Sequence, residues 1–508
     1  MLRGILTVGG WTMASRILGF GRDILIAALL GAGAVGDAFV VANKLPNLFR
    51  RLFGEGAFNA AFVPEFSGLL HTEGKQAAQL FAEQAMAVMA FWLLLLTALA
   101  QAFMPAIMAV VAYGFTGDPG KFALVVTLGR ITFPYMPLIC LTALLSGVLN
   151  GLDRFAAAAA APVIYNITSI ACMLALLPVT PTAGHALAWG VSLSGVFQLA
   201  LLVWAVRAAG MRLHIPRPRL TPQMRVLFRR MAPGLVGAGV VQLNSLVDTF
   251  IATLLPAGTN AILYFADRVN QLPLGTIGVA VGTALLPALS RQAKSGDEAG
   301  AIGTTNRAIE YALALTLPAT VALLLVPYPI ISVLFQRGAF TAETAHLSAQ
   351  ALAAYAVGLP AFVLVKVLVP AFFARGDTAM PVKIAMLAVG LNIALNFLFM
   401  VPLRHLGPPL ASSVSSWFNV LALAFVLHRR GHLVVDAHLR RTAPLMLLAG
   451  LAMGALLLVL QHFAFTDFVG LMRWVGLGVL VVGGLIGYAV AGQLIGAFDL
   501  WAMARKRP

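Results

Sequence analysis

Apolar segments long enough to span a membrane recur along the whole chain, and short polar stretches separate them. A spanning helix needs about 20 predominantly apolar residues, because every backbone polar group must be paired inside the segment. The pattern predicts fourteen such helices, near residues 5–31, 34–62, 77–112, 122–150, 157–178, 184–209, 226–255, 259–290, 305–335, 343–373, 380–401, 407–428, 440–463 and 474–500. Segments 34–62 and 259–290 hold enough polar residues that hydropathy alone could miss them. The predicted fold class is an all-α polytopic membrane protein with fourteen transmembrane helices.

Lysines and arginines are distributed unevenly among the loops between these segments. When alternate loops are assigned to opposite sides of the membrane, 22 of these cations fall on one side and 4 on the other. Loops on the cytoplasmic side carry the excess of Lys and Arg in membrane proteins. We therefore expect both termini in the cytoplasm, and we expect the basic clusters to contact anionic lipid head groups.

The composition agrees with a lipid environment. Of the 508 residues, 60% are hydrophobic and 10% are charged, whereas a soluble protein carries about 25% charged residues. The net charge of +16 raises the question of nucleic acid, but the cations form short clusters between apolar runs and no basic face interleaved with aromatic residues. Cys140 and Cys172 lie in apolar segments and imply neither a disulfide framework nor a metal cluster. The first apolar segment contains charged residues, so we expect it to remain in the mature protein rather than to be a cleaved signal peptide.

The chain resembles itself at an offset of 225 residues. Residues 26–33 (IAALLGAG) match 251–258 (IATLLPAG), and 44–47 (KLPN), 62–67 (FVPEFS) and 150–155 (NGLDRF) have counterparts in the same order. Repeated halves place the site of many transporters at the midplane. This predicts two pseudo-symmetric six-helix lobes, 1–215 and 216–433, followed by two C-terminal helices and a basic tail in 434–508. The alternative, that apolar helices rich in Gly and Pro resemble one another anyway, stays open.

Charged residues inside the predicted spans are the candidates for function. An Arg or Asp at the centre of a spanning helix costs roughly 2.5–3.5 kcal/mol, so helices that carry several should line a water-filled cavity. The first two segments and the eighth carry Arg16, Arg22, Asp23, Asp37, Lys44, Arg50, Arg51, Glu55, Asp267 and Arg268. For Arg51, Glu55, Arg130 and Lys366 a structural ion pair or an interfacial position is the favoured interpretation. For Arg16, Arg22 and Arg268 the excess of positive charge favours an anionic ligand, and the planar guanidinium group suits a pyrophosphate.

Motifs for enzymatic chemistry are missing from the sequence. There is no GxxxxGK[ST] phosphate loop, no HExxH and no GxSxG, and the nine histidines are scattered. We therefore expect a transporter and no enzyme. Its free energy should come from an ion gradient, the membrane potential or a downstream sink, and the potential supplies about 2.3 kcal/mol per charge per 100 mV.

Several long, charged strings resemble the MurJ (MviN) family. They are SRILGFGRD (15–23), GDAFVVANKLPNLFRRLFGEGAF (36–58), FVPEF (62–66), YFADRVNQLP (264–273), GTALLPALS (282–290) and VKVLVPAFFARGDTAMPVKIA (365–385). The resemblance implies the fold of the multidrug/oligosaccharidyl-lipid/polysaccharide exporter superfamily and a place in the bacterial inner membrane. It also implies the activity, which is to flip lipid II, the undecaprenyl-pyrophosphate-linked peptidoglycan precursor, from the cytoplasmic to the periplasmic leaflet. The implied partners are lipid II, membrane lipids and the cell-wall synthesis machinery.

The resemblance also implies a set of site residues. The arginines that match the family motifs are Arg16, Arg22, Arg50 and Arg268, with Asp23 and Asp37 supporting them and Lys44, Asn47 and Glu55 as further candidates. The two C-terminal helices are implied to form a groove for the polyprenyl tail, and the last helix is studded with Gly476, Gly478, Gly483, Gly484 and Gly487.

A sodium site in the second lobe is described for some family members. The matching residues here are Asp248, Asn392, Asn396 and Ser412. Because Asn396 stands where a carboxylate would bind a hard cation more strongly, the alternative is a hydrogen-bonded polar cluster without an ion. No other cofactor is expected.

Three alternative functions stay open beside lipid II transport by alternating access. A flippase of another polyprenyl-pyrophosphate-linked oligosaccharide would need the same cationic cavity. A cation-coupled drug antiporter of the same superfamily would need acidic residues in the cavity, whereas these segments are net basic. A membrane scaffold for cell-wall synthases would need no arginines in the membrane, so it would tolerate their replacement by alanine.

Overall fold

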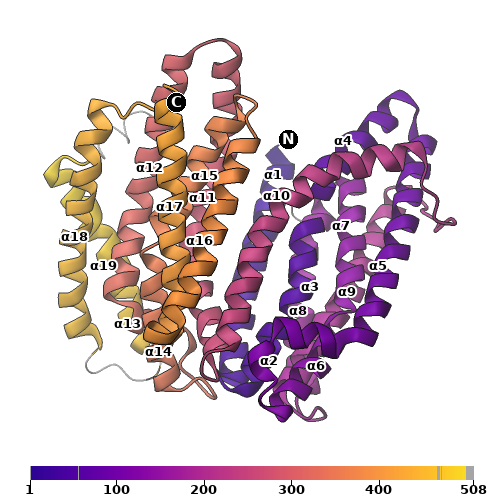
Figure 1. Cartoon of the computed structure of the whole chain (residues 1–508), viewed down its shortest axis with the longest axis horizontal. Coiled ribbons are helices and arrows are strands. Elements are labelled where there is room, and N and C mark those ends of the chain that lie inside the picture. The colour runs from indigo at the N-terminus through magenta and orange to yellow at the C-terminus, as the bar shows by residue number, and fades with distance from the viewer. Residues whose placement is uncertain (1, 55–56, 466–469, 471, 499–508) are drawn as a thin grey trace. The chain divides into compact units, whose positions relative to one another are not determined.

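The computed structural model describes residues 2–54, 57–465, 470 and 472–498, which form helices and no strands (Figure 1). The first part of the chain contains α1 (Leu2–Leu30), α2 (Ala34–Ala42), α3 (Lys44–Phe49), the π-helical turn η1 (Arg50–Gly54), α4 (Ala57–Thr72), α5 (Lys75–Val111), η2 (Tyr113–Phe115), α6 (Pro119–Thr132), α7 (Tyr135–Gly151), α8 (Phe155–Leu176), α9 (Ala183–Ala208) and α10 (Pro222–Thr253). The second part contains α11 (Thr259–Lys294), α12 (Glu298–Leu325), α13 (Pro327–Phe335), α14 (Ala342–Ala356), α15 (Leu359–Phe373), α16 (Ala379–Leu403), η3 (Arg404–Leu406), α17 (Gly407–Arg429), α18 (Ala437–Phe465) and α19 (Met472–Ile495).

Each of the fourteen predicted segments coincides with one helix or with a series of two or more shorter helices. Prolines explain the breaks, because proline lacks a backbone N–H and disfavours helix at the residue before it. Pro134 separates α6 from α7, and Pro327 begins α13 directly after the end of α12. Segment 34–62 is broken most, into α2, α3, the turn η1 and the start of α4, and Pro46 lies in the first turn of α3.

Nine helical stretches of the described chain are long and apolar enough to cross a membrane. They cover ten of the predicted segments, because the stretch Ala379–Arg429 contains two of them. The remaining four segments correspond to α1, to α2–α4, to α10 and to α11, where the charged candidate residues are concentrated. The all-helical polytopic fold is as predicted, and the count of fourteen spans stays a prediction.

Contacts divide the chain into two compact units, Met1–Ala261 and Ile262–Pro508. The predicted first lobe ended at residue 215, but α10 packs on α4 and α5 inside the first unit, and an ion pair joins Arg230 of α10 to Glu65 of α4. Contact-based units and repeat-based lobes therefore differ by one helix. The helices α18 and α19 belong to the second unit.

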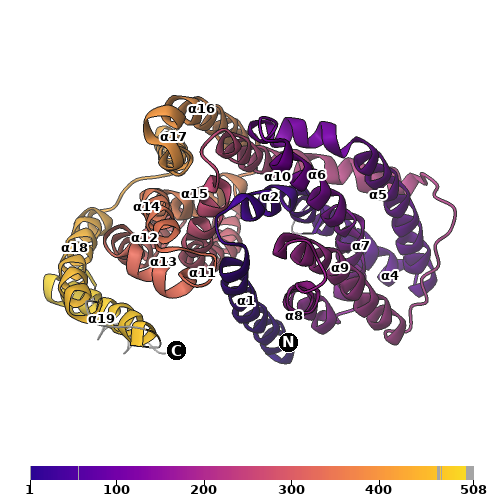
Figure 2. The same cartoon turned by 90° about the horizontal axis from the view of Figure 1, so that it is seen from below.

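In the first unit, α8 packs against both α1 and α9, and α9 also packs against α7 (Figure 2). Asn166 of α8 fixes α1 at this contact by donating from Nδ2 to the backbone oxygen of Ser15 over 2.9 Å. Gly19 lies against the same side chain, where an added Cβ would meet the Asn166 amide at 3.4 Å. The α1–α8 contact therefore sets the orientation of the helix that carries Arg16 and Arg22.

The basic linker between α9 and α10 is extended and lies along α5. Gln79 donates to the backbone oxygen of Arg212, Gln84 donates to that of Arg219, and the Glu83 carboxylate accepts the backbone N–H of His214. These contacts hold the linker backbone while the arginine side chains stay exposed. Such exposed cations suit the predicted contact with anionic head groups.

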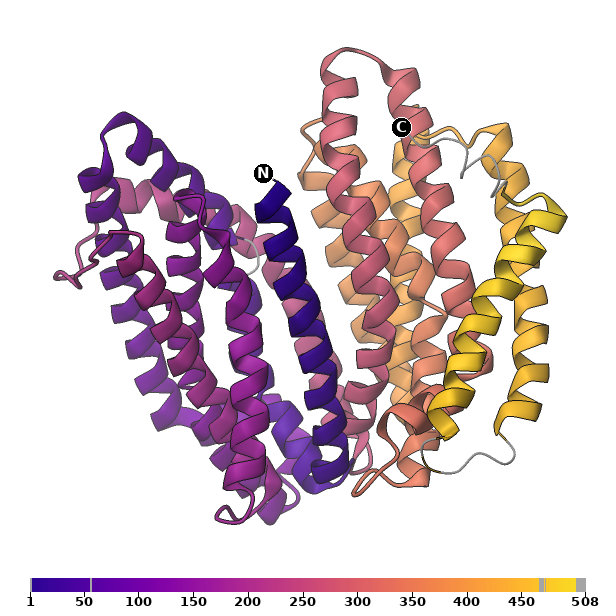
Figure 3. The same cartoon turned by 180° about the vertical axis from the view of Figure 1, so that it is seen from behind.

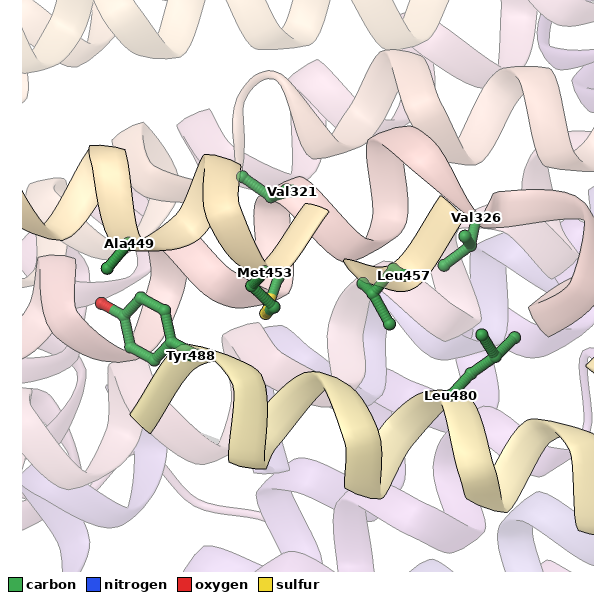
Figure 4. Packing of buried hydrophobic residues seen from close by; sticks show 7 residues of the cluster. All are labelled: Val321, Val326, Ala449, Met453, Leu457, Leu480 and Tyr488. Atoms are coloured by element: carbon green, nitrogen blue, oxygen red, sulfur yellow. The ribbon is translucent and has the colours of Figure 1, made fainter. Parts of the chain in front are cut away.

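In the second unit, α12 packs against α15 and α18. The helices α18 and α19 form a hairpin and lie side by side at the yellow end of the colour range in Figure 3. A buried apolar cluster holds the hairpin on α12 (Figure 4). Its members are Val321, Val326, Ala449, Met453, Leu457, Leu480 and Tyr488. Gly484 and Gly487 of α19 face Leu457 and Leu456 of α18, so these glycines provide close helix packing.

Candidate functional site

Arg22 and Asp23 form a buried pair in the C-terminal third of α1. Arg22 donates from Nη2 to Oδ1 of Asp23 over 2.8 Å and from Nε to the same oxygen over 3.3 Å. Arg22 is 8% exposed and Asp23 is 5% exposed. A charge at such a depth must be paired or bind a ligand, and the carboxylate fixes one edge of the guanidinium group.

The guanidinium group of Arg22 also lies over an aromatic ring. Its Cζ is 5.1 Å from the centre of the Tyr165 ring on α8. The Tyr165 ring in turn lies 5.6 Å from that of Tyr135 on α7. Three helices of the first unit therefore contribute to the surroundings of Arg22.

Arg50 and Asn47 come from the irregular part of segment 34–62. Arg50 begins the π-helical turn η1 and donates from Nε to Oδ1 of Asn47 over 3.3 Å, while Asn47 donates to the backbone oxygen of Asn43 over 2.9 Å. Single π-helical turns are frequent at functional sites. Phe49, directly before Arg50, packs on Phe133 with 6.3 Å between the ring centroids. Tyr135 follows Phe133 by two residues and contacts the Tyr165 ring beneath Arg22, so the first unit brings these two predicted arginines to one region.

Arg16, Lys44 and Glu55 are the other predicted candidates in the first two segments. The Arg16 side chain is exposed on α1, and Lys44 opens α3 in a half-buried position. Arg16 lies six residues before Arg22, which places the two side chains about 120° apart around the helix. Glu55 lies outside the described residues.

Asp37 is engaged by the protein itself. Its carboxylate, 1% exposed, accepts a hydrogen bond from Lys121 Nζ over 2.7 Å and from the backbone N–H groups of Gly258 and Ala261 over 2.6 and 3.0 Å. Lys121 also lies over the Phe115 ring at 3.9 Å. Asp37 therefore ties α2 to α6 and to the start of α11.

Arg268 is the predicted arginine of the second unit. It donates from Nη2 to the Tyr264 hydroxyl over 3.0 Å, and its Cζ lies 4.8 Å from the centre of the same ring. Its neighbour Asp267 accepts a hydrogen bond from Gln271 over 3.2 Å. Each unit thus holds one predicted arginine against a tyrosine ring. Arg22 is buried and lies over Tyr165 of the neighbouring helix α8, whereas Arg268 is half-buried and lies over Tyr264 of its own helix.

The predicted sodium ligands fall into both units. Asn392, Asn396 and Ser412 lie together in the second unit: Asn392 donates to Ser412 Oγ over 3.2 Å, and Asn396 donates to Asn392 Oδ1 over 2.9 Å. Asp248, the single carboxylate of the set, is half-buried on α10 of the first unit. The three neutral residues therefore form a hydrogen-bonded polar cluster. In the described ranges, no group of three or more His, Cys, Asp or Glu side chains is placed to hold a metal ion.

Sequence reasoning missed Lys121, Tyr165 and Tyr264. Lys121 falls in the predicted loop between segments 77–112 and 122–150, and its ion pair spans 84 residues of sequence, so no local pattern indicates it. Tyr165 gives no signal either, because a lone tyrosine in an apolar helix is ordinary. Tyr264 could have been found, since it lies four residues before Arg268 and this spacing places both on one helix face.

A polytopic helical bundle with oriented arginines in its polar helices is typical of a membrane transporter. The comparisons with known proteins agree. The family described as "Lipid II flippase MurJ" matches residues 26–475. A probable lipid II flippase MurJ of Rhizobium tropici is 42% identical over the whole of this chain and 97% of its own length, and the lipid II flippase MurJ of Burkholderia cenocepacia is 35% identical over 85% of this chain and 84% of its own length. This chain belongs to the lipid II flippase MurJ family, which confirms the resemblance in its sequence, and it is a multi-pass inner-membrane protein.

Solved structures show the same fold. A structure described as lipid II flippase MurJ in an inward closed conformation superposes with a TM-score of 0.81 at 24% identity, covering 96% of this chain and 98% of that one. An inward-facing multidrug resistance MATE family transporter of the MOP superfamily gives a TM-score of 0.67 at 14% identity, over 86% of this chain and 99% of its own. The predicted superfamily fold is confirmed.

Proposed function

We propose that this chain flips lipid II from the cytoplasmic to the periplasmic leaflet of the inner membrane. The observation that carries the proposal is the buried guanidinium group of Arg22, oriented by Asp23 and the Tyr165 ring inside a helix of a family named for this activity. A guanidinium group binds two oxygens of a phosphate at once. The pyrophosphate of the lipid-linked precursor is the anionic group that these arginines would recognise.

The proposed mechanism is alternating access with the arginines as the head-group site. Arg22 and Arg50 of the first unit bind the pyrophosphate, with Arg16 at the exposed approach along α1. Arg268 is the corresponding phosphate-binding candidate of the second unit. Binding neutralises their charge, which lowers the cost of enclosing them away from water. The polyprenyl tail stays in the bilayer beside α18 and α19, whose exposed leucines and valines offer an apolar surface.

The membrane potential is the driving force that we propose. The chain has no phosphate loop for ATP, and the potential acts on any charge that moves across the membrane. A sodium ion would find neutral oxygens at Asn392, Asn396 and Ser412, but these residues already pair with one another. The flipped precursor must be consumed in the periplasm, so the proposed partners include the cell-wall synthesis machinery.

Depletion and complementation test the proposal. Cells depleted of the protein should accumulate lipid II in the cytoplasmic leaflet, and the wild-type chain should reverse this. Arg22→Ala should not reverse it although the protein is present in the membrane, whereas Arg207→Ala, on the exposed last turn of α9, should. Unchanged lipid II distribution on depletion would refute the proposal.

The same experiment separates the alternatives. A drug antiporter would leave lipid II distribution unchanged, and a scaffold would tolerate Arg22→Ala. A flippase of another polyprenyl-pyrophosphate-linked oligosaccharide would accumulate that lipid instead. The relatives' names favour lipid II over another lipid-linked oligosaccharide. The excess of cations over carboxylates in α1–α3 argues against a drug antiporter.

A further inference from the structure

Each unit presents one of its predicted arginines on the face of a tyrosine. In the first unit, Arg22 of α1 lies over Tyr165 of α8, with 5.1 Å between Cζ and the ring centre. In the second unit, Arg268 lies over Tyr264 of the same helix at 4.8 Å. Both distances are within the range of about 6 Å in which a cation is attracted to the electron-rich face of a ring.

The Tyr165 ring is held by a closed circle of contacts across three helices. It packs on Tyr135 of α7, which is 2% exposed and donates its hydroxyl to Gln198 Oε1 of α9 over 3.3 Å. Gln198 donates from Nε2 to the backbone oxygen of Ala161 over 2.8 Å. Ala161 lies four residues before Tyr165 on α8, so the contacts return to the helix from which they started. The ring therefore has little freedom to move under the arginine.

Tyr264 is fixed through its neighbour in the chain. Phe265 is 1% exposed and packs against the rings of Phe335 and Phe340 at 5.1 and 5.0 Å between centroids. This anchors the rotation of α11 and with it the direction of the adjacent tyrosine. The Tyr264 hydroxyl adds a hydrogen bond from Arg268 Nη2 over 3.0 Å.

We propose that Tyr165 and Tyr264 are positioning residues that hold the phosphate-binding edges of Arg22 and Arg268 in place before the substrate arrives. This inference rests on the proposed function. A ring face suits the task better than a further carboxylate, because it attracts the guanidinium group without adding a full negative charge that would repel a diphosphate. Fixing a long side chain in advance also removes the entropy cost that binding would otherwise include.

The two tyrosines differ in what their hydroxyls contribute. Phenylalanine at 165 keeps the ring face, so Tyr165→Phe should stay within about twofold of wild type in apparent affinity. Tyr264→Phe loses the hydrogen bond to Arg268, and a net bond of about 1 kcal/mol corresponds to a loss of about fivefold. Leucine removes the ring at either position, and we expect about tenfold weaker apparent affinity from each Leu variant.

The test uses the full-length protein in liposomes that contain lipid II. Its readouts are the lipid II concentration at half-maximal translocation, the maximal rate and the melting temperature of each variant. The Leu variants should raise the half-maximal concentration more than they lower the maximal rate, and Tyr311→Leu, which alters an exposed tyrosine of α12, should match wild type. If Tyr165→Leu lowers the melting temperature, the comparison of affinities rests on Tyr264→Leu, whose substitution is at a half-buried position.

A double-variant cycle shows whether each tyrosine acts through its arginine. Tyr165→Leu should weaken the apparent affinity little further when Arg22→Lys is already present, and Tyr264→Leu should do likewise with Arg268→Lys. The reason is that the effects of two substitutions within one interacting pair are not additive. Leu variants with wild-type affinity, or fully additive double variants, would overturn the inference. Failure of the wild-type protein to translocate lipid II would instead overturn the proposed function, so the two failures are distinguishable.

Discussion

Two aspartates of the polar helices have different tasks although both were grouped with the site from sequence. Asp23 lies next to Arg22 and orients it. Asp37 accepts hydrogen bonds from Lys121 and from two backbone N–H groups, so it holds the fold around the site. Removing one partner of a buried pair leaves an uncompensated charge, which is more costly than removing both.

Asp37→Ala should therefore destabilise the protein strongly. It leaves the buried Lys121 ammonium group without its carboxylate, and we expect a loss of about 3–5 kcal/mol in the free energy of unfolding. Lys121→Met should cost less, since Asp37 keeps its two backbone hydrogen bonds. Melting temperatures in detergent test this, with Asp153→Asn as the control, because asparagine tolerates the left-handed backbone at that exposed position (φ 57°). Equal melting of Asp37→Ala and wild type would contradict the structural role.

At the residue scale, the sequence predicted the local partners of the charged side chains better than their distant partners. The Arg22–Asp23 pair could be foreseen because the residues are adjacent, and Arg50 with Asn47 because they lie one turn apart. The Lys121–Asp37 pair and the Tyr165 ring could not, since both depend on how distant helices pack. Long-range contacts of this kind leave no periodicity in a single sequence.

At the scale of elements, glycine decides how closely the last two helices approach. An added Cβ at Gly487 would lie 2.5 Å from Leu456 Cδ2, whereas at Gly478 it would meet nothing within 4 Å. The sequence showed that the helix is rich in glycine but not which face each glycine occupies. Breaks at Pro134 and Pro327 were likewise hidden inside continuous apolar runs.

Gly487→Val should push α19 away from α18 and lower the melting temperature. Overpacking of a close contact typically costs about 1–3 kcal/mol. The matched substitution Gly478→Val, on an exposed position of the same helix, should have little effect. If both variants melt alike, the glycine-mediated packing of the hairpin is wrong.

Two loop carboxylates of the second unit should make its stability depend on acid pH. The Arg430 guanidinium group, 2.7 Å away, and the backbone N–H of Met380 hold the pKa of Asp377 below its usual range. The backbone N–H of Leu439, followed by Arg307, lowers the pKa of Asp436. Because both pKa values are lower in the folded than in the unfolded chain, the stabilisation is present above the unfolded value of about 3.9 and is lost as pH falls through the folded value.

Melting temperature should accordingly fall below about pH 4. The fall should be smaller in Asp377→Asn and Asp436→Asn, which lack the titrating groups. Differential scanning measurements between pH 3 and pH 7 test this, and an equal fall in wild type and both variants would assign the acid sensitivity to other carboxylates.

At the scale of the whole molecule, the apolar pattern predicted the helices, and the family and fold comparisons confirm the fold class. The sequence did not predict that α10 packs with the first unit, because similarity between two halves of a sequence does not specify which helices contact each other. The two six-helix lobes stay a prediction. The loop charges add a prediction of orientation that the helix packing does not address.

Both termini should face the cytoplasm. The physical reason is the excess of positive charge on one side, which is carried by the arginines of the linker 209–221 and by the arginines and lysines of the other loops on that side. Loops with such an excess stay in the cytoplasm. Reporter fusions at the C-terminus should give the signal of a cytoplasmic location. Single cysteines in the loops at 118 and 338 should react with an impermeant thiol reagent added outside the cell. The reverse labelling pattern would contradict the assignment.

The most direct measurement of the central claim is lipid II translocation by the purified protein in liposomes, compared among wild type, Arg22→Ala, Arg268→Ala and Arg207→Ala. The account predicts that wild type and Arg207→Ala move lipid II to the opposite leaflet, and that Arg22→Ala and Arg268→Ala, folded to the same extent, lose the activity. Wild-type translocation by both of these variants would contradict it.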